Sequence, residues 1–291
     1  MKKLHGTGVA LVTPFTTRGA IDYKGLKKLL NHTAKGVDYY VVMGTTGESA
    51  TVSAEEKMQI LDFVRVNNTK KLPIVYGIGG NNTQQVMDTI KGSDLKGVSA
   101  ILSVSPYYNK PSQEGIYQHF VAIADASPLP IILYNVPGRT SSNLTADTTL
   151  RLAAHKNIIG VKEASGNLEQ CMNIAKRKPK DFMLISGDDL LTLAIYAIGG
   201  VGVISVLANA YPVTFKRIKE GIWNAQVASA QKAQFELLEI NGPMYEESNP
   251  VGVKCLLEEM GVCGRHVRMP LLPASSPLRA KIKGIYKGYE K

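Results

Sequence analysis

Short apolar segments alternate with amphipathic ones along most of the chain. Eight of the apolar segments are rich in Val and Ile, which is typical of parallel strands buried on both faces. Strand, loop and helix repeat at roughly thirty residues, the pattern of an α/β protein with a (β/α)8 barrel, or TIM barrel. The predicted strands are Gly8–Val12, Tyr39–Met43, Ile74–Gly77, Ala100–Val104, Ile131–Tyr134, Ile158–Lys162, Phe182–Ser186 and Val201–Ser205.

Capping residues mark the helix starts between these strands. Ser53 stands three residues before Glu56, which predicts a capping box. Asn82-Thr83 and Ser112 precede helical stretches at 84–91 and 113–126 in the same way. The alternative, an open doubly wound sheet, would have a GxGxxG turn after the first strand, whereas Gly6–Gly8 precedes one. The pattern therefore favours the barrel.

The strand pattern stops at about residue 225. Helical patterns then cover Ala225–Ile240, Val251–Glu259 and Ser276–Tyr286, separated by Asn249-Pro250 and by a proline-rich run. No linker composition separates them from the strands. We therefore expect a catalytic barrel over residues 1–224 and a C-terminal helical region over residues 225–291 that packs on it.

Composition narrows the function classes. The 291 residues are 44% hydrophobic and carry a net charge of +10. The basic residues lie in helix-like stretches and in the tail, so we interpret them as a solvated surface rather than a nucleic-acid groove. Three cysteines and five histidines are scattered without metal-ligand spacing, so we expect neither disulfides nor a metal. The chain lacks a signal-peptide pattern and a membrane-spanning segment, and we expect a cytoplasmic protein.

Chemistry in a barrel collects at the carboxyl ends of the strands. The sixth predicted strand places Lys162 at the end of an apolar run. Burial there disfavours the ammonium form, and a neutral amine attacks a keto acid to form an imine. The alternative is a lysine that has simply reached solvent at the strand end.

Three more strand ends carry unusual residues. The turn Gly44–Glu48 (GTTGE) can present N–H groups and hydroxyls to an anion, or it is a tight turn before a helix. Tyr134 could transfer protons, or pack as a ring, and Arg139 could pair with a substrate carboxylate. The adjacent Tyr107 and Tyr108 are expensive to expose, which indicates a subunit interface or a ligand.

These segments, in this order and spacing, resemble the dihydrodipicolinate synthase and N-acetylneuraminate lyase family of class I aldolases. The resemblance covers the whole chain and rests on GTTGE at 44–48, YNVP at 134–137, GVKE at 160–163 and SGD at 186–188. It implies a lyase that forms a Schiff base between pyruvate and Lys162. Since the imine itself is the electron sink, no organic cofactor or metal is implied.

The resemblance also implies a role for each catalytic side chain. Lys162 would form the imine, and Tyr134 would donate and accept protons. Thr45 would relay protons between Tyr134 and Tyr108, with Tyr108 entering the site of a neighbouring subunit. The protein would accordingly be a homodimer or a dimer of dimers, a homotetramer.

The remaining implied residues bind substrate. Thr46 would hold the pyruvate carboxylate, while Gly187 and Ile204 would line the pyruvate pocket. Arg139, absent from the sialic acid lyases, suits the carboxylate of aspartate semialdehyde, the aldehyde of lysine and diaminopimelate biosynthesis. The alternatives left open are a lyase for sialic or keto-sugar acids and, more remotely, a non-catalytic binding barrel.

One part of the chain departs from the family pattern. Members that are inhibited by lysine commonly carry histidine and glutamate in the effector site. Here the corresponding positions are Ala54, Lys57 and Gln85, and a cation and a neutral amide are poor hosts for an ammonium group. We expect weak or absent inhibition by lysine.

Overall fold

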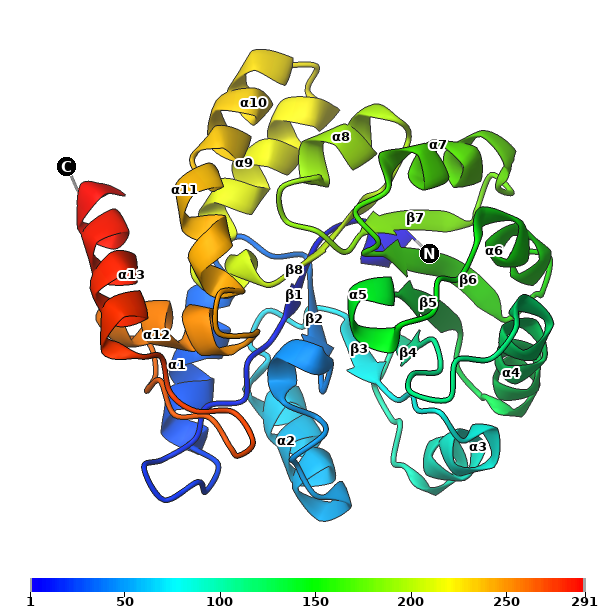
Figure 1. Ribbon diagram of the computed structural model, residues 1–291, viewed down its shortest axis with the longest axis horizontal. Helices are drawn as coiled ribbons and strands as arrows, with labels where there is room; N and C mark the ends of the chain where they lie inside the picture. Colours follow the sequence, from blue (N-terminus) through cyan, green and yellow to red (C-terminus); the bar gives the residue numbers. More distant parts are fainter. Residues whose placement is uncertain (1, 290–291) are drawn as a thin grey trace. The chain divides into compact units, whose positions relative to one another are not determined.

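Eight parallel strands form a closed barrel in chain order, β1 to β8, in the computed structural model, which describes residues 2–289 (Figure 1). The predicted fold is confirmed, and all eight predicted strands form. They are β1 Gly6–Ala10, β2 Tyr39–Val42, β3 Ile74–Gly77, β4 Ala100–Val104, β5 Ile131–Asn135, β6 Ile158–Glu163, β7 Met183–Ser186 and β8 Gly202–Ser205.

Helices follow the strands along the chain and continue beyond the last of them. The α-helices are α1 Tyr23–Thr33, α2 Ala54–Asn67, α3 Thr83–Gly92, α4 Gln113–Ala126, α5 Pro137–Thr140, α6 Ala146–Leu152, α7 Leu168–Arg177, α8 Thr192–Ala197, α9 Pro212–Trp223, α10 Val227–Phe235, α11 Leu238–Asn241, α12 Val251–Glu259 and α13 Ser276–Tyr289. Short 3₁₀ helices are η1 Lys2–Leu4, η2 Thr45–Gly47, η3 Leu207–Asn209 and η4 Gly242–Met244.

Contacts divide the chain into two compact units, and each is described by itself. The first contains residues 2–6 and 73–204, and the second contains residues 7–72 and 205–289. The expected division into residues 1–224 and 225–291 stays a prediction.

The first unit carries strands β3 to β7, and Figure 1 shows α3, α4, α6 and α7 along their outer side. Most of their apolar side chains are buried, as expected for strands covered on both faces. The register of β5 against β6 pairs Tyr134 with Lys162. Gly160 on β6 lets β7 approach closely, because a Cβ there would lie 2.8 Å from the carbonyl oxygen of Met183. The register thus places Tyr134 and Lys162 side by side near the carboxyl ends of neighbouring strands.

The second unit carries β1, β2, α1, α2 and the helices after β8. The predicted capping box is confirmed: Ser53 Oγ accepts the Glu56 N–H, and the Glu56 carboxylate accepts the Ser53 N–H. Helix α12 begins and ends as predicted, and its first seven residues are all buried. The helix predicted over Ala225–Ile240 is divided into α10 and α11, because Leu237 N–H bonds to Gln234 O in a tighter turn.

Candidate active site

Lys162 lies at the carboxyl end of β6 with only 5% of its surface exposed. Its Nζ is 4.3 Å from the centroid of the Tyr134 ring. It forms no ion pair with any residue that the structure describes. The Nζ is therefore not held in an ion pair with a described carboxylate, and the alternative of a lysine that reaches solvent is wrong, because the side chain is buried.

Tyr134 is 7% exposed, and its register position opposite Lys162 fixes the two side chains as neighbours. The Lys162 Nζ lies over its ring, which is the geometry of a cation–π contact. Both side chains belong to strands, which hold functional groups more precisely than loops do. The pair has the components of an imine-forming site with an adjacent proton-transfer group.

Glu163 points to the opposite face of β6 from Lys162, because successive side chains in a strand alternate. Its buried carboxylate accepts hydrogen bonds from Asn135 Nδ2 at 3.0 and 3.1 Å, from Ser165 N–H at 2.8 Å and from Gln170 Nε2 at 2.8 Å. Asn135 Oδ1 in turn accepts the Leu144 N–H. This network ties together the strand ends that carry Tyr134 and Lys162.

Two residues of the first unit are predicted to line the pyruvate pocket, Gly187 and Ile204, and both lie at or next to the carboxyl ends of strands. Gly187 follows β7, and its N–H donates to the Glu163 carbonyl oxygen at 2.7 Å. A Cβ at Gly187 would lie 2.5 Å from the Ala164 Cβ, so the backbone approach there requires glycine. Ile204, on β8, is 1% exposed.

Arg139 and Tyr108 extend toward solvent. Arg139 lies in the short helix α5, which follows β5, and its side chain is exposed. Tyr108 is 88% exposed and has a positive φ of 72°, which is uncommon for a bulky residue. Its loop is fixed to the β3–α3 loop, since Asn81 Nδ2 donates to the Tyr107 carbonyl oxygen and Asn109 Nδ2 donates to that of Asn81. A fixed loop that exposes an aromatic ring is suited to contact with another molecule.

Thr45 and Thr46 lie in the second unit, in the 3₁₀ turn η2 directly after β2. The hydrogen bonds of the turn begin with Gly47 N–H to Gly44 O, so the N–H groups of Thr45 and Thr46 precede them. Thr46 is 2% exposed, and its Oγ1 accepts a hydrogen bond from Asn249 Nδ2 at 3.0 Å. The GTTGE segment therefore forms a tight turn whose donors remain available to an anion.

Comparison with known proteins decides the family. The model of the "Dihydrodipicolinate synthetase family" matches residues 3–288. The chain belongs to this family. A 4-hydroxy-tetrahydrodipicolinate synthase from Cytophaga hutchinsonii is 49% identical over 284 residues, which cover 97% of this chain and 96% of that one.

Solved structures of the dihydrodipicolinate synthetase family agree with the fold. The chloride-inhibited dihydrodipicolinate synthase from Acinetobacter baumannii, complexed with pyruvate, is 37% identical to this chain. The two structures superpose over 98% of each chain with a TM-score of 0.93. The enzyme from Cyanidioschyzon merolae with lysine bound is 36% identical and covers 99% of both chains with a TM-score of 0.94.

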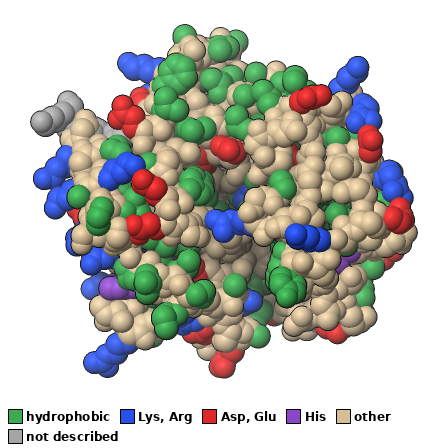
Figure 2. Space-filling model, in the orientation of Figure 1, with side chains coloured by type: hydrophobic (Ala, Val, Ile, Leu, Met, Phe, Trp, Pro, Cys, Tyr) green, Lys and Arg blue, Asp and Glu red, His purple; other side chains and the backbone are tan. Residues whose placement is uncertain are grey.

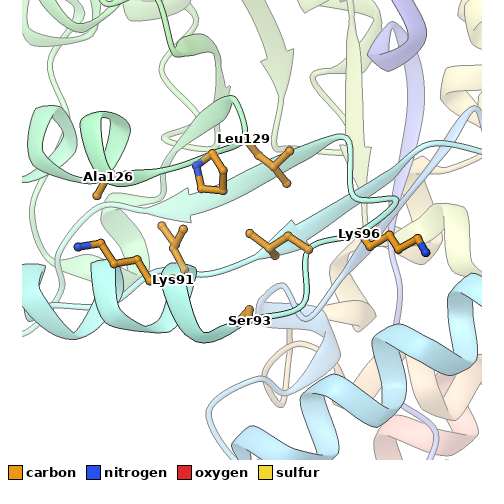
Figure 3. A pocket seen from close by; sticks show the side chains of 8 residues that line it. Lys91, Ser93, Lys96, Ala126 and Leu129 are labelled. Carbon is orange, nitrogen blue, oxygen red and sulfur yellow. The ribbon is translucent and has the colours of Figure 1, made fainter.

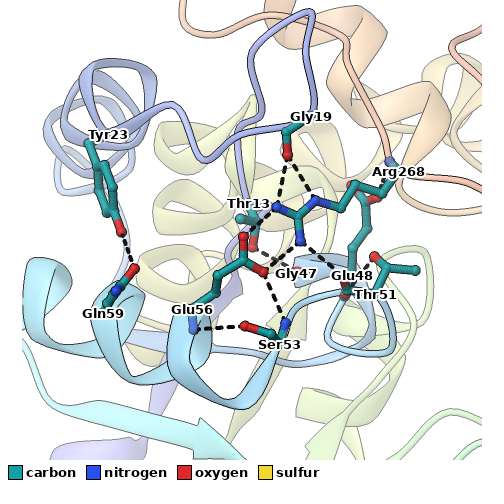
Figure 4. A network of polar contacts seen from close by, with 10 residues as sticks. All are labelled: Thr13, Gly19, Tyr23, Gly47, Glu48, Thr51, Ser53, Glu56, Gln59 and Arg268. Carbon is teal, nitrogen blue, oxygen red and sulfur yellow. Dashed lines mark hydrogen bonds and ion pairs between the residues drawn. The ribbon is translucent and has the colours of Figure 1, made fainter.

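The carboxylate of Glu48, directly after the GTTG turn of this family member, is held by residues that the sequence patterns did not single out. Glu48 Oε1 accepts from Lys254 Nζ at 2.5 Å, and Oε2 accepts the Arg268 N–H at 2.9 Å. Figure 4 shows the Arg268 guanidinium between the carbonyl oxygens of Gly19 and Thr51 and the Glu56 carboxylate. The hydrogen bonds from Arg268 lower the pKa of Glu56 to about 2.

Lys254 itself is completely buried in α12. Burial lowers its pKa, against the opposing effect of the Glu48 charge. A lone lysine in the apolar segment VGVKCLL is the same kind of pattern that makes Lys162 a candidate, so Lys254 can be singled out from the sequence in the same way.

A surface hollow of about 540 Å³ lies elsewhere in the first unit (Figure 3). Its walls include Leu95 and Lys96, ahead of β4, and Pro128 and Leu129, ahead of β5. It therefore lies at the amino ends of these strands, whereas Lys162 stands at the carboxyl end of β6. This hollow is therefore not the candidate active site.

Charge and metal-ligand distributions add no further site within the part of the chain that the structure describes. On the face shown in Figure 2, Lys and Arg side chains are dispersed among acidic ones. Between residues 2 and 289, no group of three or more His, Cys, Asp or Glu side chains could hold a metal ion. Across that same range, no helix has the length and apolar character needed to cross a membrane.

Proposed function

We propose that the protein is a 4-hydroxy-tetrahydrodipicolinate synthase that condenses pyruvate with L-aspartate 4-semialdehyde. The buried Lys162, stacked on Tyr134, is the observation that carries this proposal. Full-length relatives that bear this name, at 49% and 46% identity, support it. The reaction belongs to the biosynthesis of lysine and diaminopimelate, and we propose a cytoplasmic location for it.

The reaction begins when the Lys162 amine attacks C2 of pyruvate and the carbonyl oxygen leaves as water. The protonated imine withdraws electrons, so a proton is lost from the methyl carbon and an enamine forms. Tyr134, next to the amine, moves this proton. The enamine carbon then attacks the aldehyde carbon, and the new oxyanion takes up a proton. Finally, the amino group of the second substrate displaces Lys162 from the imine, which closes the ring and frees the enzyme.

We assign the other family positions to supporting roles. Thr46 binds the pyruvate carboxylate, supported by its buried hydroxyl and by the free donors of its turn. Gly187 and Ile204 line the pyruvate pocket. Thr45 relays protons between Tyr134 and Tyr108, and Tyr108 reaches the site of a second subunit in a homodimer or dimer of dimers. The exposure of Tyr108 on a fixed loop supports this last role.

Arg139 separates the synthase from the alternative, a lyase of the same family that cleaves sialic or keto-sugar acids. In the synthase, Arg139 would donate two charge-assisted hydrogen bonds to the carboxylate of aspartate semialdehyde. Because Arg139→Ala loses both, it should raise the KM for aspartate semialdehyde on the order of 100-fold. Borohydride trapping with pyruvate alone should stay unchanged. Turnover of N-acetylneuraminate above that of aspartate semialdehyde, or an unchanged KM in Arg139→Ala, would favour the alternative.

A further inference from the structure

Two buried side chains from the region after β8 contact the turn that carries Thr45 and Thr46. Asn249 Nδ2 donates to Thr46 Oγ1 at 3.0 Å, and Lys254 Nζ donates to Glu48 Oε1 at 2.5 Å. Asn249 is 7% exposed and Lys254 is 0% exposed. We infer that Asn249 and Lys254 are positioning residues for the turn that binds the pyruvate carboxylate. This inference rests on the proposed function.

Asn249 sets the direction of the Thr46 hydroxyl proton. A hydroxyl has one proton to donate and lone pairs to accept. The Asn249 amide occupies an acceptor position of Thr46 Oγ1, and no described residue accepts the Thr46 proton. That proton therefore remains for the substrate carboxylate, which accepts but cannot donate.

Lys254 holds the far end of the same turn. Glu48 has φ 55° and ψ 37°, the left-handed conformation that residues with a Cβ avoid, so the surrounding structure must hold it there. In this conformation its N–H closes the turn on the Thr45 carbonyl oxygen at 3.0 Å. Its carboxylate is anchored by Lys254 and by the Arg268 N–H, and Lys254 Nζ is itself fixed by the His266 carbonyl oxygen at 2.7 Å. Without this anchor, Glu48 can leave the left-handed region, and Thr45 and Thr46 move with it.

Stability alone does not account for such an arrangement. A buried ion pair is often no more stabilising than well-packed apolar residues of the same volume, because both charges lose their hydration. The charges do, however, impose one geometry on the groups that carry them. Here the imposed geometry is that of the turn after β2, which the proposed function assigns to pyruvate binding.

The test measures how trapping by borohydride depends on pyruvate concentration, in the full-length protein. Asn249→Ala should raise the pyruvate concentration for half-maximal trapping about tenfold, as expected for one lost orienting hydrogen bond. Asn249→Asp has nearly the same shape, but it accepts the Thr46 proton and adds a negative charge. It should raise that concentration further, to about 100-fold, whereas a merely structural role would make it the milder change. The maximal trapping rate should stay within about threefold of wild type in both variants.

The ion pair is tested with the double variant Lys254→Met, Glu48→Gln, which leaves no buried charge unpaired. It should fold and show about a tenfold rise in the same concentration. The matched control is Lys219→Met, which removes a different lysine of the second unit, paired with Asp38 at 2.6 Å and away from the turn. That variant should bind pyruvate as the wild type does.

The outcomes separate the inference from the function on which it rests. If the wild type is trapped by pyruvate but all Asn249 and Lys254 variants bind pyruvate normally, the positioning roles are wrong and the proposed function stands. If Asn249→Asp resembles the wild type more than Asn249→Ala does, Asn249 does not orient the Thr46 proton. If the wild type is not trapped at all, both proposals fail.

Discussion

Replacing Glu163 by glutamine should destabilise the protein strongly, although the two side chains have nearly the same shape. Glu163 is 3% exposed, and each of its oxygens faces two N–H donors: Asn135 and Ser165 at Oε1, Asn135 and Gln170 at Oε2. An amide turns one of these acceptors into a donor. In either orientation, the new NH2 group faces other donors.

The magnitude follows from these contacts. A hydrogen bond to a charged group contributes about 1.5–3 kcal/mol, and a buried donor left without an acceptor costs about 1–3 kcal/mol. One loss of each kind gives a decrease of about 3–5 kcal/mol in the free energy of unfolding. Rotation of the Gln170 amide cannot relieve this, because its Nε2 also donates to Leu144 O at 3.2 Å and its Oε1 accepts from Asn143 at 2.8 Å.

Urea unfolding provides the assay, with the midpoint and the slope fitted separately. We expect the midpoint to fall and the slope to stay unchanged, which identifies a loss of stability rather than of compactness. Glu114→Gln is the control, because that carboxylate, like Glu163, accepts from a glutamine amide, and from Arg151 as well, but lies exposed on α4. It should unfold close to the wild-type midpoint. A loss below about 1 kcal/mol in Glu163→Gln would show that the buried network does not depend on a charge.

Three further changes have clear expected results. Burial lowers the pKa of His119 to about 4, so the folded protein resists protonation while the unfolded chain protonates near pH 6.5, and stability is lost as the pH falls from about 6.5 to 4. His119→Asn should flatten this part of the stability curve by up to about 3 kcal/mol. An unchanged curve would contradict the lowered pKa of His119. Gly187→Ala should reduce kcat/KM for pyruvate at least tenfold, since its Cβ would lie 2.5 Å from that of Ala164; wild-type kinetics would show that the backbone moves freely there. Lysine should not inhibit at submillimolar concentration in a coupled assay, because Lys57, although half-buried, brings a cation to the position expected to receive the effector's ammonium group; submillimolar inhibition would refute this.

Much of the fold could be predicted because apolar runs and capping residues determine it locally. β3, β4, α4 and α12 begin and end at the predicted residues. The first strand is Gly6–Ala10, two residues earlier in the chain than the predicted Gly8–Val12. Glycine and threonine at 6–8 are a weak strand pattern, and the start is fixed by long-range bonds, Gly6 N–H to Val201 O and Thr7 N–H to the Asp38 carboxylate.

The candidate site could be predicted only where reactive residues stand at strand ends. Lys162 and Tyr134 are singled out in this way, and their register on β5 and β6 makes them neighbours. Asn249 and Lys254 were not found, because their partners Thr46 and Glu48 are about 200 residues away in the chain. Local patterns contain no information about such pairs, whereas a lysine inside an apolar helix did offer a signal.

The central claim, imine formation on Lys162, is tested most directly by reduction with borohydride in the presence of pyruvate, followed by peptide mass spectrometry. We predict one reduced pyruvyl group on Lys162, no adduct without pyruvate, and no adduct in Lys162→Arg. The other lysine of interest, Lys254, is completely buried and paired with Glu48, so it should remain unmodified. An unmodified Lys162 in the wild type, or an adduct on a different lysine, would contradict the account.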